Sequence, residues 1–325
     1  TGKLSLDIPH ALFLLRDSKD LAMLNPDQKK DFEALLPGQS TEAGASRRTA
    51  LKAVLGVGYA AAAMPLMAQT AIKTSSEGLI TGEISYVVNG FKVPAFFVAP
   101  AGKTNLPVVL VLHEIFGVHQ YIADTARRFA RAGYLAIAPE LFARQGDPAM
   151  YGEMAKLIAE VVSKTPDAEV LADLDGAVDW AAQHGGNPDK VAITGFCWGG
   201  RITWLYAQQS NKVKAGAAWY GRLVGESSVR NPKHPLDLAA MQKAPVLGLY
   251  GAEDSGIPLV TVNQMKRALA AAGSAGNAAA EGCEFVVYRD APHAFHADYR
   301  PSYRAEPAQD GFKRTLAWFK AHGVA

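Results

Sequence analysis

The sequence predicts an α/β protein in which helices cover both faces of a mainly parallel sheet. Short, continuous apolar runs such as Val108–Leu112 and Val191–Thr194 are typical of strands that are buried on both faces. These runs alternate with stretches of helical spacing, such as Trp198–Gln208, and this alternation is the pattern of parallel strands joined by crossover helices. Ligands of such proteins bind beyond the carboxyl ends of the strands, so candidate site residues are sought there.

The elements begin with a hairpin. Ile84–Val88 and Phe91–Val98 flank Asn89-Gly90, which suits a type I′ turn because both central residues need positive φ angles. Short apolar runs predict the later strands at Val108–Leu112, Tyr134–Ala138, Val191–Thr194, Ala215–Trp219, Val246–Tyr250 and Glu284–Tyr288. Helical spacing predicts helices at Ile122–Ala132, Met150–Ser163, Ala168–His184, Trp198–Gln208, Val260–Ala271 and Gln309–Ala321. No repeat of roughly 20–50 residues is visible, which argues against a solenoid.

The composition is that of an ordinary globular protein. The 325 residues suggest one large domain plus an extension, or two domains, at roughly 100–200 residues each. The net charge of +2 is too small to indicate a nucleic-acid partner. With only two cysteines, Cys197 and Cys283, a disulfide scaffold is excluded as the basis of stability.

The N-terminal part divides into an extension, residues 1–45, and a candidate export signal, residues 46–71. Arg47 and Arg48 precede the apolar run Ala53–Ala68, which ends among small residues, as in a twin-arginine signal. The run is too short and too rich in glycine and alanine for a stable membrane span. The segment therefore predicts a partner in the twin-arginine export machinery and a periplasmic location. The alternative is a cytoplasmic protein in which the segment is a surface helix.

A nucleophile motif directly follows the strand predicted at Val191–Thr194. The sequence Gly195-Phe196-Cys197-Trp198-Gly199-Gly200 is a G-x-S-x-G elbow with cysteine in place of serine. The helix that starts at this turn directs backbone N–H groups and its positive end at the site, which favours a thiolate and an oxyanion. The motif predicts an α/β-hydrolase fold for residues 72–325, with Cys197 as nucleophile. The alternatives are a structural cysteine in a glycine-rich turn and a redox-sensing thiol.

The order nucleophile, acid, histidine in this fold indicates where the partners of Cys197 lie. Asp254 follows the strand Val246–Tyr250 and is preferred as the acid, although Glu253 also qualifies. His293 follows the strand Glu284–Tyr288 and is the expected base, with His296 as its rival. Such a base takes the thiol proton and returns it to the leaving group.

The remaining histidines do not suggest a metal site. His113, His119 and His184 lack the spaced cysteine, histidine or acid partners of a zinc site. No metal and no cofactor are therefore predicted, and the expected partner is a small-molecule ester or lactone substrate.

Several motifs occur in a fixed order from about Ser75 to the end of the chain. They are His113-Glu114-Ile115-Phe116-Gly117, Ala138-Pro139-Glu140-Leu141-Phe142-Ala143-Arg144-Gln145, the cysteine elbow, Trp219-Tyr220-Gly221, Gly251-Ala252-Glu253-Asp254 and Pro292-His293-Ala294-Phe295. Taken together, they resemble the dienelactone hydrolase family. The resemblance implies an α/β-hydrolase with a Cys-His-Asp triad at Cys197, His293 and Asp254.

The resemblance also implies roles for residues outside the triad. Glu114 is expected to contact the nucleophile and to help generate the thiolate, and Arg144 to bind a substrate carboxylate. A neutral resting thiol is physically sensible there, because a carboxylate and a thiolate side by side cannot both ionise cheaply. The oxyanion hole is expected at the backbone N–H groups of Ile115 and Trp198. The family's second arginine has no counterpart in register, since Ala297 stands there.

The predicted function is hydrolysis of a small ester or enol lactone through a thioester acyl-enzyme. Two alternatives stay open at this point. One is a general carboxylesterase or thioesterase, and the other is a catalytically silent homologue that binds a small molecule.

Overall fold

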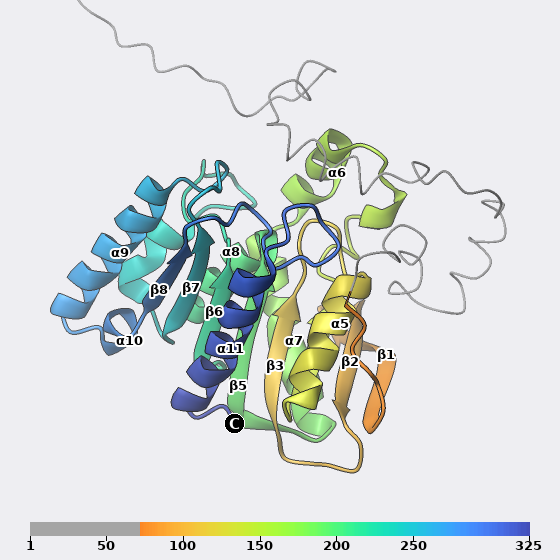
Figure 1. Cartoon of the computed structure of the whole chain (residues 1–325). Coiled ribbons are helices and arrows are strands. Elements are labelled where there is room, and N and C mark those ends of the chain that lie inside the picture. Colours follow the sequence, from red (N-terminus) through yellow and green to blue (C-terminus); the bar gives the residue numbers. More distant parts are fainter. Residues whose placement is uncertain (1–71) are drawn as a thin grey trace, which may run out of the picture.

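A computed structural model describes residues 72–325 of the chain (Figure 1). The predicted extension at residues 1–45 and the predicted export signal at residues 46–71 lie outside the described residues and stay predictions. No helix within residues 72–325 is long and apolar enough to cross a membrane.

The described chain is built on an eight-stranded sheet with the order β1-β2-β4-β3-β5-β6-β7-β8. From β4 to β8 every neighbouring pair is parallel, whereas β1 pairs with β2, and β2 with β4, in antiparallel fashion. The mainly parallel sheet is thus confirmed. The strands are β1 (Leu79–Val88), β2 (Phe91–Pro100), β3 (Leu106–Leu112), β4 (Leu135–Pro139), β5 (Gly186–Phe196), β6 (Ala215–Trp219), β7 (Val246–Gly251) and β8 (Glu284–Tyr288).

The hairpin forms where the sequence predicts it. Val88 pairs with Phe91, and the two residues between them, Asn89 and Gly90, have φ angles of 49° and 79°. Positive φ at both central positions is the type I′ turn that matches the twist of the strands. β1 nevertheless begins at Leu79, earlier than predicted, because its first residues are largely exposed and give little apolar signal.

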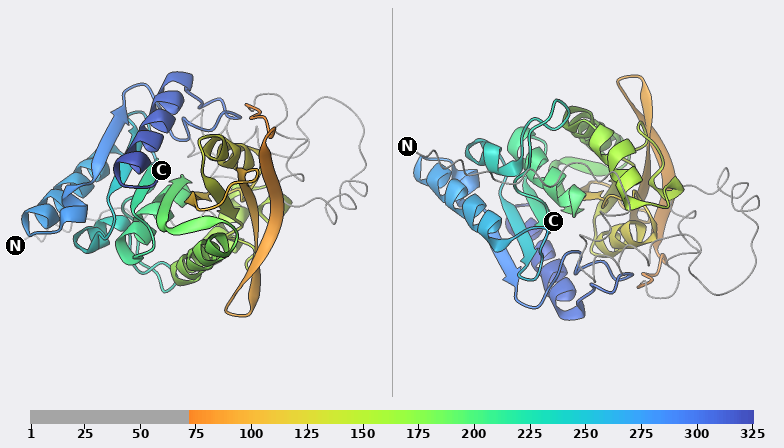
Figure 2. Two further views of the ribbon diagram at one scale, coloured as in Figure 1. Left: turned by 90° about the horizontal axis from the view of Figure 1, so that it is seen from below. Right: turned by 90° about the horizontal axis from the view of Figure 1, so that it is seen from above.

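Helices cover both faces of the sheet. Figures 1 and 2 show α5 and α11 on one face and α7 and α8 on the other. The helices are α5 (Gln120–Arg131), α6 (Met154–Glu160), α7 (Asp167–Gln183), α8 (Trp198–Gln209), α9 (Leu259–Ser274), α10 (Ala278–Glu281) and α11 (Ala305–Ala321), with short 3₁₀ turns η2 (Pro148–Met150), η3 (Val162–Lys164) and η4 (Pro235–Met241).

One predicted helix is wrong in detail. The segment Met150–Ser163 is not continuous, because η2 ends at Met150 and α6 starts only at Met154. Gly152 lies in the gap, and a glycine disfavours helix continuation by about 1 kcal/mol relative to alanine. The segment therefore forms a short, broken cap rather than one long helix.

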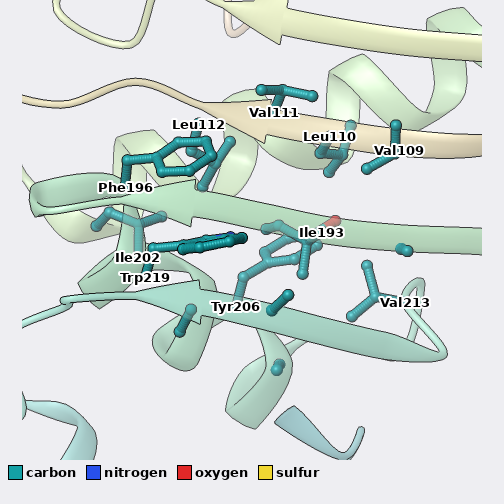
Figure 3. Close-up of a cluster of buried hydrophobic side chains, with 14 of the residues drawn as sticks. Val109, Leu110, Val111, Leu112, Ile193, Phe196, Ile202, Tyr206, Val213 and Trp219 are labelled. Carbon is teal, nitrogen blue, oxygen red and sulfur yellow. The ribbon is translucent and has the colours of Figure 1, made fainter. Parts of the chain in front are cut away.

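The core lies around the central strands β3, β5 and β6 and helix α8. Figure 3 shows side chains such as Leu110, Ile193, Phe196, Tyr206 and Trp219 packed between these elements, and all five are fully buried or nearly so. Burial of each such side chain stabilises the fold by roughly 1.5–3 kcal/mol. The carboxyl end of β5 is therefore fixed on both sides by a dense core.

The junction between β5 and α8 depends on glycines. A Cβ atom at Gly195 would lie 2.2 Å from the Gly199 carbonyl oxygen, and one at Gly199 would lie 2.6 Å from the His113 carbonyl oxygen. Both obstacles are backbone atoms, which cannot move aside as a flexible side chain can. Only glycine at these positions lets α8 start this close to β5 and to the end of β3.

Gly195→Ala is expected to lower the free energy of unfolding by about 3 kcal/mol, because the added methyl group must push two backbone segments apart. Urea denaturation measures the change. Gly152→Ala is the matched control, since a Cβ atom there meets nothing within 4 Å. Equal stability of the two variants would contradict the argument from close backbone approach.

Candidate active site

The cysteine elbow sits at the carboxyl end of β5. Cys197 has φ 55° and ψ −111°, a left-handed conformation that is uncommon for a residue with a side chain and costs on the order of 1–3 kcal/mol. Its N–H donates to the Trp219 carbonyl oxygen at 3.0 Å, and its own carbonyl accepts from the Arg201 N–H at 3.2 Å. The elbow therefore fixes a partly exposed thiol at the first turn of α8.

Asp254 is held rigidly in the loop after β7. Its Oδ1 accepts from the backbone N–H groups of Gly256 (2.9 Å) and Ile257 (3.1 Å), and its Oδ2 lies 2.7 Å from Nδ1 of His293. An ionised carboxylate only accepts, so the Nδ1 atom of His293 carries the proton in this bond. Glu253, the other acid considered, is exposed, and the structure joins Asp254 to the histidine.

His293 connects the carboxylate to the sulfur. Its Nδ1 binds Asp254 at 2.7 Å, and the Cys197 side chain lies close enough to influence the charge state of the ring. Burial lowers the pKa of His293, but the charges of Asp254 and Cys197 outweigh burial and hold this pKa well above its usual value. A ring with high proton affinity is suited to take the proton of the thiol. Asp254 thus orients His293 through a hydrogen bond, and Cys197 is an electrostatic neighbour of the same ring.

His296, the rival base, belongs to the interior. Its Nδ1 lies 2.6 Å from the Tyr121 hydroxyl, and its ring stacks on Phe196 at 4.9 Å between centroids. Burial, with a smaller contribution from Arg128, lowers its pKa well below the usual value. His296 is therefore neutral at physiological pH, and its ring is held by Tyr121 and Phe196.

Glu114 is fully buried in the loop after β3. Its Oε2 accepts from the Tyr299 hydroxyl at 2.7 Å, its Oε1 lies 3.6 Å from the Arg300 guanidinium, and His119 is 3.9 Å away. The Arg300 side chain also donates to the Tyr299 hydroxyl at 3.0 Å. These partners stabilise a buried carboxylate, and a contact between Glu114 and Cys197 stays a prediction.

The two predicted oxyanion donors flank the elbow. Trp198 is the first residue of α8, and Ile115 lies in the loop whose first carbonyl, that of His113, packs against Gly199. The Trp198 indole stacks on the His113 ring at 5.5 Å and contacts Phe142 at 4.5 Å between centroids. The reacting carbonyl group would therefore lie among aromatic side chains.

A small apolar cluster joins this loop to the cap formed by η2, α6 and η3. Phe142, Leu157 and Val161 are its buried centre, and Ile115, Phe116, Tyr151, Val162 and Trp198 pack on it. Because Ile115 and Trp198 also carry the predicted donors, a substrate bound there would contact an apolar wall.

Arg144, the predicted carboxylate-binding residue, is engaged elsewhere. Both of its terminal nitrogens bind the carboxylate of Asp173 on α7, and its guanidinium lies 4.5 Å from the Phe91 ring centroid in the hairpin. Its expected contact with a substrate carboxylate stays a prediction and would require this ion pair to open. Among residues 72–325, no group of three or more histidine, cysteine, aspartate or glutamate side chains could hold a metal ion.

Comparison with known proteins places this geometry in a family. The model of the dienelactone hydrolase family matches residues 93–323. The chain belongs to the dienelactone hydrolase family. It therefore stands among carboxylic ester hydrolases, as the sequence motifs predict.

The relatives of this dienelactone hydrolase family member cover most of its length. A Methylorubrum extorquens protein that is provisionally assigned as a carboxymethylenebutenolidase is 52% identical over 295 residues, which are 90% of this chain and 99% of that protein. An Escherichia coli K12 protein with the same provisional assignment is 49% identical and covers 82% of this chain and 96% of its own length.

A crystal structure supports the fold assignment of this family member. It shows a protein from Klebsiella pneumoniae that is provisionally assigned as a dienelactone hydrolase, with 54% identity and a TM-score of 0.71. The alignment covers 74% of this chain and 98% of that one. The α/β-hydrolase fold predicted from the elbow is confirmed.

Sequence reasoning did not assign roles to Tyr299, Arg300 or Glu140. Tyr299 and Glu114 are 185 positions apart in the chain, so no local motif joins them. The one sequence signal for Tyr299 and Arg300 was the run Asp298-Tyr299-Arg300, which follows His293 closely. The charges and the hydroxyl group of this run suggest buried partners.

Asp254→Asn is expected to lower the pKa of His293, because burial remains while the opposing charge of Asp254 is lost. The rate kcat should fall by up to about 10⁴-fold, since the amide no longer stabilises the required tautomer. NMR titration of the ring and steady-state kinetics measure the two effects. Asp290→Asn, an exposed change in the loop that carries His293, is the control. An unchanged titration of His293 would refute the assigned pairing.

Proposed function

We propose that the protein hydrolyses a small carboxylic ester or enol lactone, with Cys197 as nucleophile and a thioester acyl-enzyme as intermediate. The observation that carries the proposal is the His293 ring, which binds Asp254 at 2.7 Å and has Cys197 close enough for its charge to raise the pKa of the ring. Membership of a hydrolase family supports it. A catalytically silent homologue would not need a strained nucleophile and an aligned base together.

The first half of the proposed reaction forms the acyl-enzyme. His293 takes the proton of the Cys197 thiol, and the sulfur attacks the substrate carbonyl carbon. The carbonyl oxygen becomes an oxyanion and accepts hydrogen bonds from the backbone N–H groups of Ile115 and Trp198, each contributing about 3 kcal/mol to transition-state stabilisation. Collapse of the tetrahedral intermediate breaks the ester C–O bond, and His293 gives its proton to the leaving oxygen.

The second half releases the acid. His293 takes a proton from water, and the resulting hydroxide attacks the thioester carbonyl carbon. The same two N–H groups bind the new oxyanion. Collapse breaks the C–S bond, and His293 returns a proton to the sulfur. The carboxylic acid leaves, and Cys197 is ready for another cycle.

Glu114 is proposed to assist the first proton transfer. A second carboxylate near the sulfur, once released from its own partners, can hydrogen-bond the thiol and pass its proton on to His293. In the structure this carboxylate is bound by Tyr299 and is 3.6 Å from Arg300. The proposed role therefore requires Glu114 to exchange these partners for Cys197 when substrate binds.

A general carboxylesterase or thioesterase is the second candidate, and the surroundings of Ile115 and Trp198 favour it. The apolar cluster beside the predicted donors suits an uncharged acyl group. Arg144, which would recognise a carboxylate, is bound to Asp173 instead. A panel of neutral and carboxylate-bearing esters and lactones distinguishes the two candidates.

Cys197→Ala is expected to abolish ester hydrolysis and leave the unfolding transition unchanged, because the sulfur is the attacking atom. Cys197→Ser should retain only weak activity, since its hydroxyl is a poorer nucleophile at neutral pH. Hydrolysis of a chromogenic ester measures both effects. Cys283→Ala is the matched control, because burial raises the pKa of the Cys283 thiol to about 12 and leaves it unreactive. Turnover by the Cys197→Ala protein would refute the nucleophile.

Arg144→Gln is expected to destabilise the fold by roughly 2–3 kcal/mol, because the buried Asp173 carboxylate loses its partner. The expected loss is smaller than that for breaking a fully buried ion pair, because the Arg144 side chain is 17% exposed. The ratio of kcat/KM for neutral and carboxylate-bearing esters should not change. Arg267→Gln, on the exposed surface of α9, is the control. A selective loss of the carboxylate-bearing substrates would instead establish Arg144 as a substrate-binding residue.

A further inference from the structure

A buried pair of titratable side chains lies directly beneath the loop that carries Glu114 and Ile115, and the proposed reaction does not use it. His113 follows β3 and is fully buried, and Glu140 follows β4 and is 2% exposed. Because β3 and β4 are neighbours in the sheet, their carboxyl ends bring the two side chains together. The closest approach joins His113 Nε2 to Glu140 Oε1 at 3.4 Å.

The hydrogen bonds of His113 define its protonation state. Its Nδ1 lies 2.6 Å from the backbone oxygen of Glu114, which only accepts, so Nδ1 carries a proton. Its Nε2 accepts from the backbone N–H of Leu141 at 3.0 Å, so Nε2 carries none. Burial lowers the pKa of His113 to about 4, in agreement with a neutral ring. The electron pair of Nε2 therefore accepts from Leu141, and Glu140 Oε1 lies 3.4 Å from the same nitrogen.

The carboxyl group of Glu140 has one satisfied and one unsatisfied oxygen. Oε2 accepts from the Val118 N–H at 2.7 Å, whereas Oε1 has no hydrogen-bond partner among the described residues. An ionised Oε1 would place two acceptors face to face in a buried space, which is costly. A proton on Oε1 removes this repulsion and lets the carboxyl group share the Nε2 electron pair with the Leu141 N–H. Burial raises the pKa of Glu140 to about 7, which makes that proton available near neutral pH.

The pair holds the loop from His113 to Val118 at both ends. His113 binds the Glu114 carbonyl, and Glu140 binds the Val118 N–H. Between them, Gly117 has φ +75°, and a Cβ atom there would lie 2.8 Å from Glu140 Oε2. The loop is therefore closely packed on the carboxyl group.

We propose that Glu140 and His113 are positioning residues, and that one proton shared between them locks the loop that presents the Ile115 N–H and the Glu114 side chain. The part that concerns Ile115 rests on the proposed function. The groups that face the pair are few. Asp147 adds to the raised pKa of Glu140, the backbone N–H groups of Val118 and Phe142 oppose it, and the neutral ring of His119 lies beyond His113.

The proposal has a definite dependence on pH. The folded-state pKa of Glu140 is raised above its ordinary value, so the group stabilises the loop fully at low pH. This contribution is lost as the pH rises through about 7. Above that pH a carboxylate faces the Nε2 electron pair, and the loop should loosen.

The decisive variant is Glu140→Gln. Its amide NH₂ can donate to His113 Nε2 and its amide oxygen can accept from Val118, so it reproduces the protonated carboxyl group without titrating. We expect kcat/KM within about twofold of wild type at pH 6 and at least about threefold above wild type at pH 8.5, with the change in kcat rather than KM. Glu83→Gln, an exposed change on β1, should follow wild type at every pH.

Glu140→Ala, which removes both bonds, should lower kcat by about 10-fold or more at both pH values, as expected when an oxyanion donor is misplaced. A constant ratio of Glu140→Gln to wild-type activity across this pH range would overturn the proposal. So would equal loss of activity in the Gln and Ala variants.

Thermal unfolding supplies a readout that needs no catalysis. The melting temperature of the Glu140→Gln protein should rise relative to that of wild type as the pH increases from 5.5 to 8. Only wild type loses a stabilising proton over this range. A difference that does not increase would exclude the buried proton. If the proposed hydrolysis is wrong, wild type will show no turnover. The thermal unfolding measurement would still decide whether the Glu140–His113 pair shares a proton.

Discussion

The close backbone approach of β5, α8 and the end of β3 is the constraint on which the rest of the site depends. Gly195 and Gly199 let three segments meet at distances that any side chain would forbid. This approach forces Cys197 into a left-handed conformation and places its thiol at the start of a helix. The strain is sustained because the surrounding core, with Phe196 and Trp219 fully buried, leaves the elbow no alternative.

Three of the buried carboxyl groups, Asp254, Glu114 and Glu140, follow strands near this rigid point, and each has different partners. Asp254 is charged and satisfied by two backbone N–H groups and His293. Glu114 is surrounded by Tyr299, Arg300 and His119. Glu140 has no lysine or arginine beside it among residues 72–325 and is best accommodated with a proton. Because burying an unpaired charge is costly, the partners of each carboxyl group indicate whether it supports the base, exchanges a proton or positions a loop.

The sequence predicts those features whose cause is local. The elbow, the type I′ turn at Asn89-Gly90 and an acid directly after β7 each depend on a few adjacent residues, and the structure has them in place. It did not predict the partners of Glu114, because Tyr299 is 185 positions away and neither residue type is diagnostic alone. The break before α6 was missed because apolar spacing continues through a glycine that the helix does not cross.

Family membership likewise indicates features set by the backbone, but it leaves open features set by individual side chains. The proposed attack and oxyanion binding depend on backbone geometry, and a solved relative at 54% identity shares the fold that sets it. Choice of substrate depends on side chains beside the reacting carbonyl, and in the proposed site Ile115, Phe116 and Trp198 belong to an apolar cluster. The guanidinium of Arg144 balances Asp173, and a carboxylate-bearing substrate would have to displace that buried partner. A neutral acyl group would avoid that cost and gain contact with the apolar wall, so uncharged esters agree best with the side chains of this particular chain.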